Sequence, residues 1–222
     1  GLVKEDTRLS FLGFGTMNGK DGKPFKTREG GVMRLENLIA DIDEEMFTKI
    51  VENRSVRDKD ARDTAKIVGL AAIKYGDLSN QATKDYIFDV DRFTSFEGNT
   101  GPYILYTIVR IKSILNRYVE AGGNLEAGEI LPASNGSEKN LMLQLSGFGS
   151  MIESAFEEKA PHKICAYIYE VSNAFNSFYH ETKILSEENQ AQKESYIRLL
   201  QLTKRVLETS IDLLGFEAPD KM

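Results

Sequence analysis

Hydrophobic residues recur at helical spacing along most of the chain, but the first 35 residues follow a different pattern. There the apolar stretch RLSFLGFG, the turn-rich NGKDGK and the extended GGVMRL predict strands and turns. After Leu35, the segments LENLIADIDEEMFTKIVEN and KDARDTAKIVGLAAIKYG each predict a helix. Gly76 is expected just beyond the end of the second helix, where glycine is favoured.

Four further apolar stripes follow, and each is typical of a helix that buries one face. The first opens after FEGNTGP, and the segment EAGGNLEAGEILPASNGSE behind it predicts a long loop. Pro161 opens the third of these stripes, and Gly215 ends the fourth. In order, their members are Ile104, Ile108, Ile111, Leu115 and Tyr118; Leu141, Leu145, Phe148 and Ile152; Ile164, Tyr167, Ile168, Val171, Phe175 and Phe178; Leu200, Leu207, Ile211 and Leu214. Because such stripes must pack against each other, we expect a mainly α chain with a helical bundle from about residue 98 onward.

Composition narrows the function classes. The 222 residues are 41% hydrophobic and 28% charged, which is typical of a globular chain, and no apolar run approaches the roughly 20 residues of a membrane helix. Cys165 is the only cysteine, so no intramolecular disulfide forms and a reducing cytoplasm is expected. With only His162 and His180 beside it, no metal site is expected. The net charge of −6 means that any contact with nucleic acid depends on local basic patches.

One such patch is DGKPFKTREGG, residues 21–31. Lys23, Lys26 and Arg28 alternate with other residues, which in an extended loop places the cations on one side, and the glycines allow backbone N–H groups to approach an anion. A polyphosphate suits this arrangement, and a solvated basic hairpin accounts for it as well. The order G-x-x-x-x-G-K-[ST] is absent, so the loop is not a P-loop.

Two helical faces are candidates for binding RNA. Besides its apolar stripe, the helix that opens at Pro102 carries Tyr103, Tyr106, Arg110, Ser113 and Arg117 at intervals of three and four. Such residues stack on bases and hold phosphates. The alternative is that the tyrosines cap the core of the bundle and the arginines are solvated.

The second face lies near the end of the later helix. There we expect Phe175 and Phe178 in the core and Asn176 as a structural hydrogen-bonding residue. Tyr179 and His180 are placed either on an RNA-binding face or in solvent, and Cys165 is expected to act as a small buried hydrophobe.

Four segments, in this order, resemble the arginyl-tRNA synthetases. FGTMNGKDGKPFKTREGG is similar to the family's divergent K-M-S-K-S signature loop, and FDVDRFTSFEGNTGPYILYTIVRIKSIL to its G-N-T-G-P-Y segment. CAYIYEVSNAFNSFYHETKIL and the ending LLGFEAPDKM look like its DALR anticodon-binding domain. The resemblance runs from about residue 11 to Met222, whereas nothing like the H-x-G-H element of class I synthetases occurs.

The resemblance implies an arginine–tRNA ligase, which uses ATP with Mg²⁺ to activate L-arginine and transfers it to tRNA(Arg). It implies catalytic roles for Lys26 and Arg28, and contacts with the ATP phosphates for Lys23, Lys26, Thr27 and Arg28. Contacts with tRNA are expected from Tyr103, Arg110, Tyr179, His180 and Met222.

The resemblance also implies a domain organisation. Residues 1–97 are expected to be the last part of a class I catalytic region, with a strand and loop remnant and a helical connector, and residues 98–222 a DALR-type bundle. By itself such a portion is expected to be inactive, monomeric and cytoplasmic, with no membrane partner. A stand-alone helical module for RNA binding or protein interaction is the alternative.

Overall fold

The computed structural model describes residues 3–4, 6–20, 22–23, 34–52 and 58–222. In these residues the chain is mainly α, as predicted. The elements, in order, are β1 (Met17–Asn18), α1 (Leu35–Glu52), α2 (Asp58–Leu78), β2 (Tyr86–Ile87), α3 (Val90–Phe93), α4 (Gly101–Glu120), α5 (Gly136–Ser146), α6 (Phe148–Glu158), α7 (Pro161–Glu181) and α8 (Gln190–Leu213).

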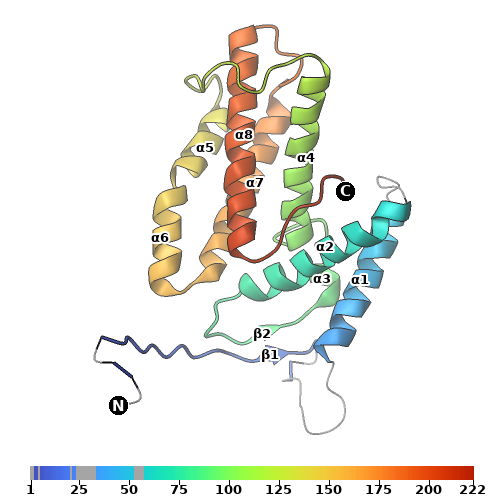
Figure 1. Ribbon diagram of the computed structural model, residues 1–222, viewed down its shortest axis with the longest axis vertical. Helices are drawn as coiled ribbons and strands as arrows, with labels where there is room; N and C mark the ends of the chain where they lie inside the picture. Colours follow the sequence, from blue (N-terminus) through green and yellow to red (C-terminus); the bar gives the residue numbers. More distant parts are fainter. Residues whose placement is uncertain (1–2, 5, 21, 24–33, 53–57) are drawn as a thin grey trace.

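The second half of the chain forms the predicted bundle (Figure 1). Helix α4 rises from α2 and α3, the loop 121–135 crosses the far end, and α5 and α6 descend together as one bent leg. Helix α7 then rises and α8 descends. Helix α7 packs against α4, α5, α6 and α8. The predicted stripes form the interior, since Ile104, Ile108 and Ile111 on α4 and Phe175 and Phe178 on α7 are fully buried.

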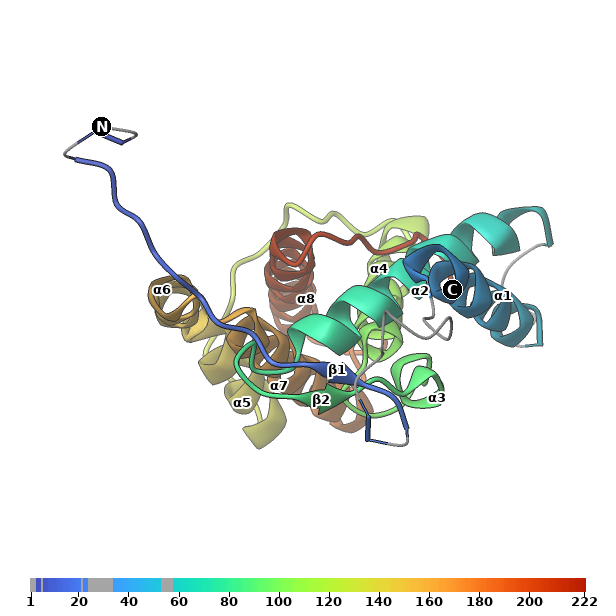
Figure 2. The same ribbon diagram turned by 90° about the horizontal axis from the view of Figure 1, so that it is seen from below.

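The first half of the chain packs beside one end of this bundle. Helices α1 and α2 lie against each other, and α2 contacts both α4 and α7. The extended segment before β1 passes beneath α6 and α7 (Figure 2). β1 pairs in parallel with β2, with Met17 opposite Tyr86 and Asn18 opposite Ile87. One hydrophobic cluster includes buried residues from both halves, from Leu38 to Phe216.

Two details of the helix predictions are wrong. Gly76 does not end α2, which continues to Leu78. The glycine instead makes room for a ring, since a Cβ there would lie 2.5 Å from Cδ2 of Phe93. The stripe from Leu141 to Ile152 belongs to two helices and not one. At Gly147, ψ is −4°, so the chain bends there while the hydrophobic spacing continues through the bend.

The expectation for Cys165 is confirmed. Cys165 is fully buried, and burial raises the pKa of its thiol to about 12, so the side chain is a small neutral hydrophobe. In the described part of the chain, none of the helices has the length and apolar character needed to cross a bilayer.

Candidate nucleic-acid interface

The segment before α4 fixes where that helix starts. Thr100 is its N-cap: the hydroxyl accepts a hydrogen bond from the backbone N–H of Tyr103 at 3.2 Å and donates to the carbonyl oxygen of Ser95 at 2.6 Å. Gly101 allows close approach to α2, since a Cβ there would lie 2.3 Å from the carbonyl oxygen of Ala71. The first turn of α4 is therefore held against α2, and the side chains that follow it are held in register.

Tyr103 connects this helix to α7. Its hydroxyl donates to Oδ1 of Asn173 at 2.8 Å and accepts from Nδ2 of Asn176 at 2.8 Å. The half-buried ring meets Tyr169 edge-on at 5.7 Å between ring centres. Burial raises the pKa of Tyr103, so the phenol stays protonated and keeps its proton available for Asn173.

Arg110 lies two turns after Tyr103 on α4 and also faces α7. Its Nη1 donates to Oδ1 of Asn176 at 2.7 Å, which confirms that Asn176 has a structural hydrogen-bonding role. The guanidinium carbon lies 4.7 Å from the ring centre of Tyr106 and 5.3 Å from that of Tyr179. Both rings are partly open to solvent, with 42% of Tyr106 and 37% of Tyr179 exposed.

Tyr179 and His180 close this cluster at the end of α7. The ring of Tyr179 stacks on Phe175 at 6.0 Å, and the exposed ring of His180 meets Tyr179 at 5.8 Å. Four of the residues predicted to contact tRNA, namely Tyr103, Arg110, Tyr179 and His180, therefore gather on one surface. We call this surface the α4–α7 face; it consists of Tyr103, Tyr106, Arg110, Asn173, Asn176, Tyr179 and His180.

Met222, the fifth predicted tRNA contact, lies elsewhere. The chain after α8 packs along α4, where Pro219 is buried and Met222 is half-buried against the hydrophobic core. Nζ of Lys112 donates to the carbonyl oxygens of residues 218 and 219, at 3.3 Å each. Lys112 follows Arg110 by two residues, which is about 200° around an α-helix, so the tail lies on a different side of α4 from the α4–α7 face.

The basic loop can be described only at its start. Lys26, Thr27 and Arg28 lie outside the described residues. Lys23 is exposed, and its carbonyl oxygen accepts a hydrogen bond from the backbone N–H of Gly19 at 2.9 Å.

Lys20 ties the start of this loop to α3. Its ammonium forms ion pairs with Asp89, at 3.2 Å, and with Asp91. The hydrogen bond from Lys20 lowers the pKa of Asp91, so this carboxylate stays ionised well below neutral pH. Together with the pairing of β1 and β2, these contacts fix where the chain enters the loop.

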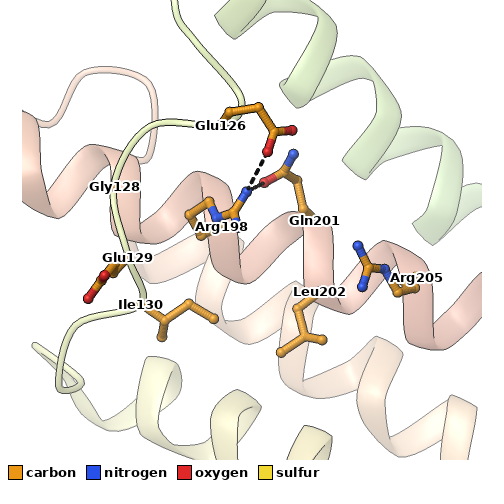
Figure 3. Close-up of a pocket in the computed structure, with 8 residues that line it drawn as sticks. All are labelled: Glu126, Gly128, Glu129, Ile130, Arg198, Gln201, Leu202 and Arg205. Atoms are coloured by element: carbon orange, nitrogen blue, oxygen red, sulfur yellow. Dashed lines mark hydrogen bonds and ion pairs between the residues drawn. The ribbon is translucent and has the colours of Figure 1, made fainter.

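A cavity of about 460 Å³ lies between the loop 121–135 and α8, and none of the residues described above line it (Figure 3). Arg198 lines this cavity; it donates a hydrogen bond to the carbonyl oxygen of Leu125 at 3.2 Å and forms an ion pair with Glu126 at 3.6 Å. Glu129 and Arg205 also line it. Because the lining carries charges of both signs and none of the predicted site residues, we do not assign RNA binding to this cavity.

The helical bundle that carries the α4–α7 face matches a known domain family. The chain belongs to the DALR anticodon-binding domain family, which matches residues 104–222. Residues 1–90 match the family described as tRNA synthetases class I (R), catalytic domain. The resemblance drawn from the four sequence segments is thereby confirmed.

Individual relatives agree with this assignment. The whole chain is 66% identical to part of an arginine–tRNA ligase of Agathobacter rectalis and 57% identical to part of one from Alkaliphilus oremlandii. It spans about 38% of the length of each of these curated relatives. Among solved structures, the arginyl-tRNA synthetase of Thermus thermophilus superposes with a TM-score of 0.80 at 25% identity, over 94% of this chain and 34% of that one. That of Plasmodium falciparum gives a TM-score of 0.77 at 25% identity, over 95% of this chain and 35% of that one.

Proposed function

We propose that this chain is the anticodon-binding bundle and the loop-bearing part of the catalytic region of an arginine–tRNA ligase. The observation that carries the proposal is the α4–α7 face: a half-buried arginine held between two partly exposed tyrosine rings, in a domain of an anticodon-binding family. Exposed rings stack on unpaired bases, and an oriented guanidinium binds phosphate oxygens or base edges, so this face suits a single-stranded RNA loop. A stand-alone module is not favoured, since residues 1–90 match a catalytic domain.

In the proposed reaction, the carboxylate of L-arginine attacks the α-phosphate of ATP, and the bond to pyrophosphate breaks. The resulting arginyl-adenylate then esterifies the 3′ end of tRNA(Arg), releasing AMP. We assign Lys26 and Arg28 to the negative charge that builds up on the departing pyrophosphate, with Lys23 and Thr27 beside them. Mg²⁺ enters as part of the ATP substrate.

The proposal extends to partners and location. The tRNA anticodon stem-loop is placed on the α4–α7 face, with Met222 as a further contact on the tail. We propose a monomeric enzyme in the cytoplasm, where ATP and tRNA meet. Light scattering of the purified full-length protein measures its mass directly, and a dimer mass contradicts the monomer.

Aminoacylation kinetics of the full-length protein test the placement of the RNA. Arg110→Ala is expected to raise KM for tRNA(Arg) by about tenfold or more, since hydrogen bonds to charged groups contribute about 1.5–3 kcal/mol. The KM for ATP is expected to stay unchanged. Arg205→Ala is the matched control, because it removes the same charge from an exposed residue that lines the cavity between the loop 121–135 and α8.

Two results contradict the proposal. An unchanged KM for tRNA in Arg110→Ala removes the α4–α7 face from RNA binding. A full-length protein that charges no tRNA with arginine refutes the ligase assignment itself.

A further inference from the structure

Three hydrogen bonds form a directed chain across the α4–α7 face. Arg110 donates to Oδ1 of Asn176, Nδ2 of Asn176 donates to the hydroxyl of Tyr103, and this hydroxyl donates to Oδ1 of Asn173, with lengths of 2.7, 2.8 and 2.8 Å. Resting on the RNA-binding function proposed above, we propose that Asn176 is a positioning residue for tRNA recognition. It makes no RNA contact of its own and acts by holding the guanidinium of Arg110 ready for the RNA.

The direction of this chain fixes the orientation of the Asn176 amide. A guanidinium has only donors, so the side of Asn176 that faces Arg110 must be its oxygen. The NH₂ group then meets the oxygen of Tyr103, whose single proton is directed to Asn173. Turning the amide over would place donor against donor at Arg110, so the half-buried side chain has one satisfied orientation.

The same contacts restrict Arg110. Its side chain has several rotatable bonds, and freezing them on binding reduces affinity. The bond to Asn176 and the rings of Tyr106 and Tyr179 hold the group before RNA arrives. One of the five guanidinium N–H groups is used by Asn176, which leaves in-plane donors for a pair of acceptor oxygens or nitrogens. The matching ligand is therefore an acceptor pair in the plane of the guanidinium, on a phosphate or on a base edge.

This assignment distinguishes Asn176 from a residue that reads a base directly. A base reader contributes to affinity whether or not Arg110 is present. A positioning residue contributes only through Arg110, so its effect disappears once the arginine is removed. The two roles therefore predict different double-mutant cycles.

The cycle uses the full-length protein and the dissociation constant for tRNA(Arg), measured by fluorescence titration. Asn176→Ala is expected to weaken binding by roughly three- to tenfold, the range that corresponds to one lost hydrogen bond of ordinary strength. In the Arg110→Ala background, the same substitution is expected to change binding by less than about twofold. Asn116→Ala is the control, since it removes an exposed asparagine from α4, the helix that carries Arg110, and is expected to leave binding unchanged.

A second variant covers the case in which Asn176→Ala does not fold. Tyr103→Phe keeps the ring and removes only the hydroxyl, whose hydrogen bonds go to Asn173 and Asn176. It is expected to weaken binding about two- to threefold, and again only while Arg110 is present. Melting temperatures measured in parallel identify any loss that reflects unfolding.

The outcomes separate the two proposals. Additive losses for Asn176→Ala and Arg110→Ala overturn the positioning role, because they indicate an independent contact with RNA. A full effect of Asn176→Ala alongside no effect of Arg110→Ala overturns it as well, and also removes Arg110 from the RNA-binding face. A protein that does not bind tRNA(Arg) refutes the proposed function and this inference together.

Discussion

Replacing Tyr75 with phenylalanine is expected to destabilise the junction between the two halves of the molecule. Tyr75 lies on α2 and is fully buried, and its hydroxyl lies 2.5 Å from Oδ1 of Asn99 and 2.8 Å from the carbonyl oxygen of Cys165. One hydroxyl thus joins α2, the segment before α4, and α7. The substitution removes a single oxygen atom and keeps the ring, so packing changes little.

The size of the loss in stability depends on whether the two acceptor oxygens, of Asn99 and Cys165, find other hydrogen-bond donors after the substitution. A hydrogen bond contributes about 0.5–1.5 kcal/mol net, and an acceptor left dry costs more. Asn99 is exposed, so its oxygen can turn to water, whereas the carbonyl of Cys165 lies in the buried part of α7. We therefore expect a loss of about 1–2 kcal/mol in the free energy of unfolding. For a domain of this size, that loss lowers the melting temperature by about 2–8 °C.

The same group predicts a dependence on pH. Burial raises the pKa of Tyr75 far above its usual value of about 10. Above that value the unfolded chain releases this proton while the folded chain keeps it, so the contribution of Tyr75 to stability falls as pH rises. The difference in stability between the wild type and Tyr75→Phe is therefore expected to be constant below about pH 9 and to shrink above about pH 10.

Circular dichroism melts from pH 7 to 11 measure both effects. Tyr167→Phe is the control: its hydroxyl makes one hydrogen bond, to the carbonyl oxygen of Gln144 at 3.0 Å, and the residue is only half-buried. It should lose less than about 1 kcal/mol. Equal losses in both variants, or a gap for Tyr75→Phe that widens above pH 10, refute the argument from burial.

Three further predictions concern other parts of the chain. Gly76→Ala is expected to lower the free energy of unfolding by about 1–3 kcal/mol, because the added Cβ meets the ring of Phe93. Gly149→Ala, with open space around the added atom, should raise it by about 0.5–1 kcal/mol. Chemical denaturation measures both changes, and two changes in the same direction contradict the reasoning. Lys26→Ala in the full-length protein is expected to slow ATP–pyrophosphate exchange by about 10²–10³-fold, and a change within about twofold removes the role proposed for this lysine. Deleting residues 220–222 should lower the melting temperature only slightly, because the half-buried Met222 is lost while the bonds from Lys112 to residues 218 and 219 remain. The deletion should also raise KM for tRNA, and an unaltered KM leaves the tail without a role in binding.

The helices were predictable from the sequence because each buries one face. The stripe on α4 and the pair Phe175 and Phe178 are buried as their spacing predicts. The bend at Gly147 was not predictable, because its backbone stays in the helical region and the hydrophobic positions keep their phase across it. Gly76 lies within α2 and accommodates the ring of Phe93, a residue from a later segment, and no local pattern contains that contact.

The candidate interface was predictable in part. Tyr103 and Arg110 share one face of a single helix, so their proximity follows from spacing alone. Their partners Asn173 and Asn176 are about seventy positions away, and only the packing of α4 on α7 brings them together. Asn173 was missed, although its spacing of three from Asn176 places both amides on one side of α7. The position of the tail was missed for the same reason, since it depends on hydrogen bonds from Lys112, more than a hundred positions earlier in the chain.

Helix α4 links the α4–α7 face to the contacts that Lys20 makes just before the basic loop. Its start is pressed onto α2 at Gly101 and capped by Thr100, and the segment just before it begins at α3, where Asp91 holds Lys20 at the entrance to the loop. Fewer than twenty residues separate the last of these contacts, at Asp91, from the first residue of the α4–α7 face, at Tyr103. The bond from Arg110 to Asn176 then joins α4 to α7, so the α4–α7 face is built on two helices that both contact α2.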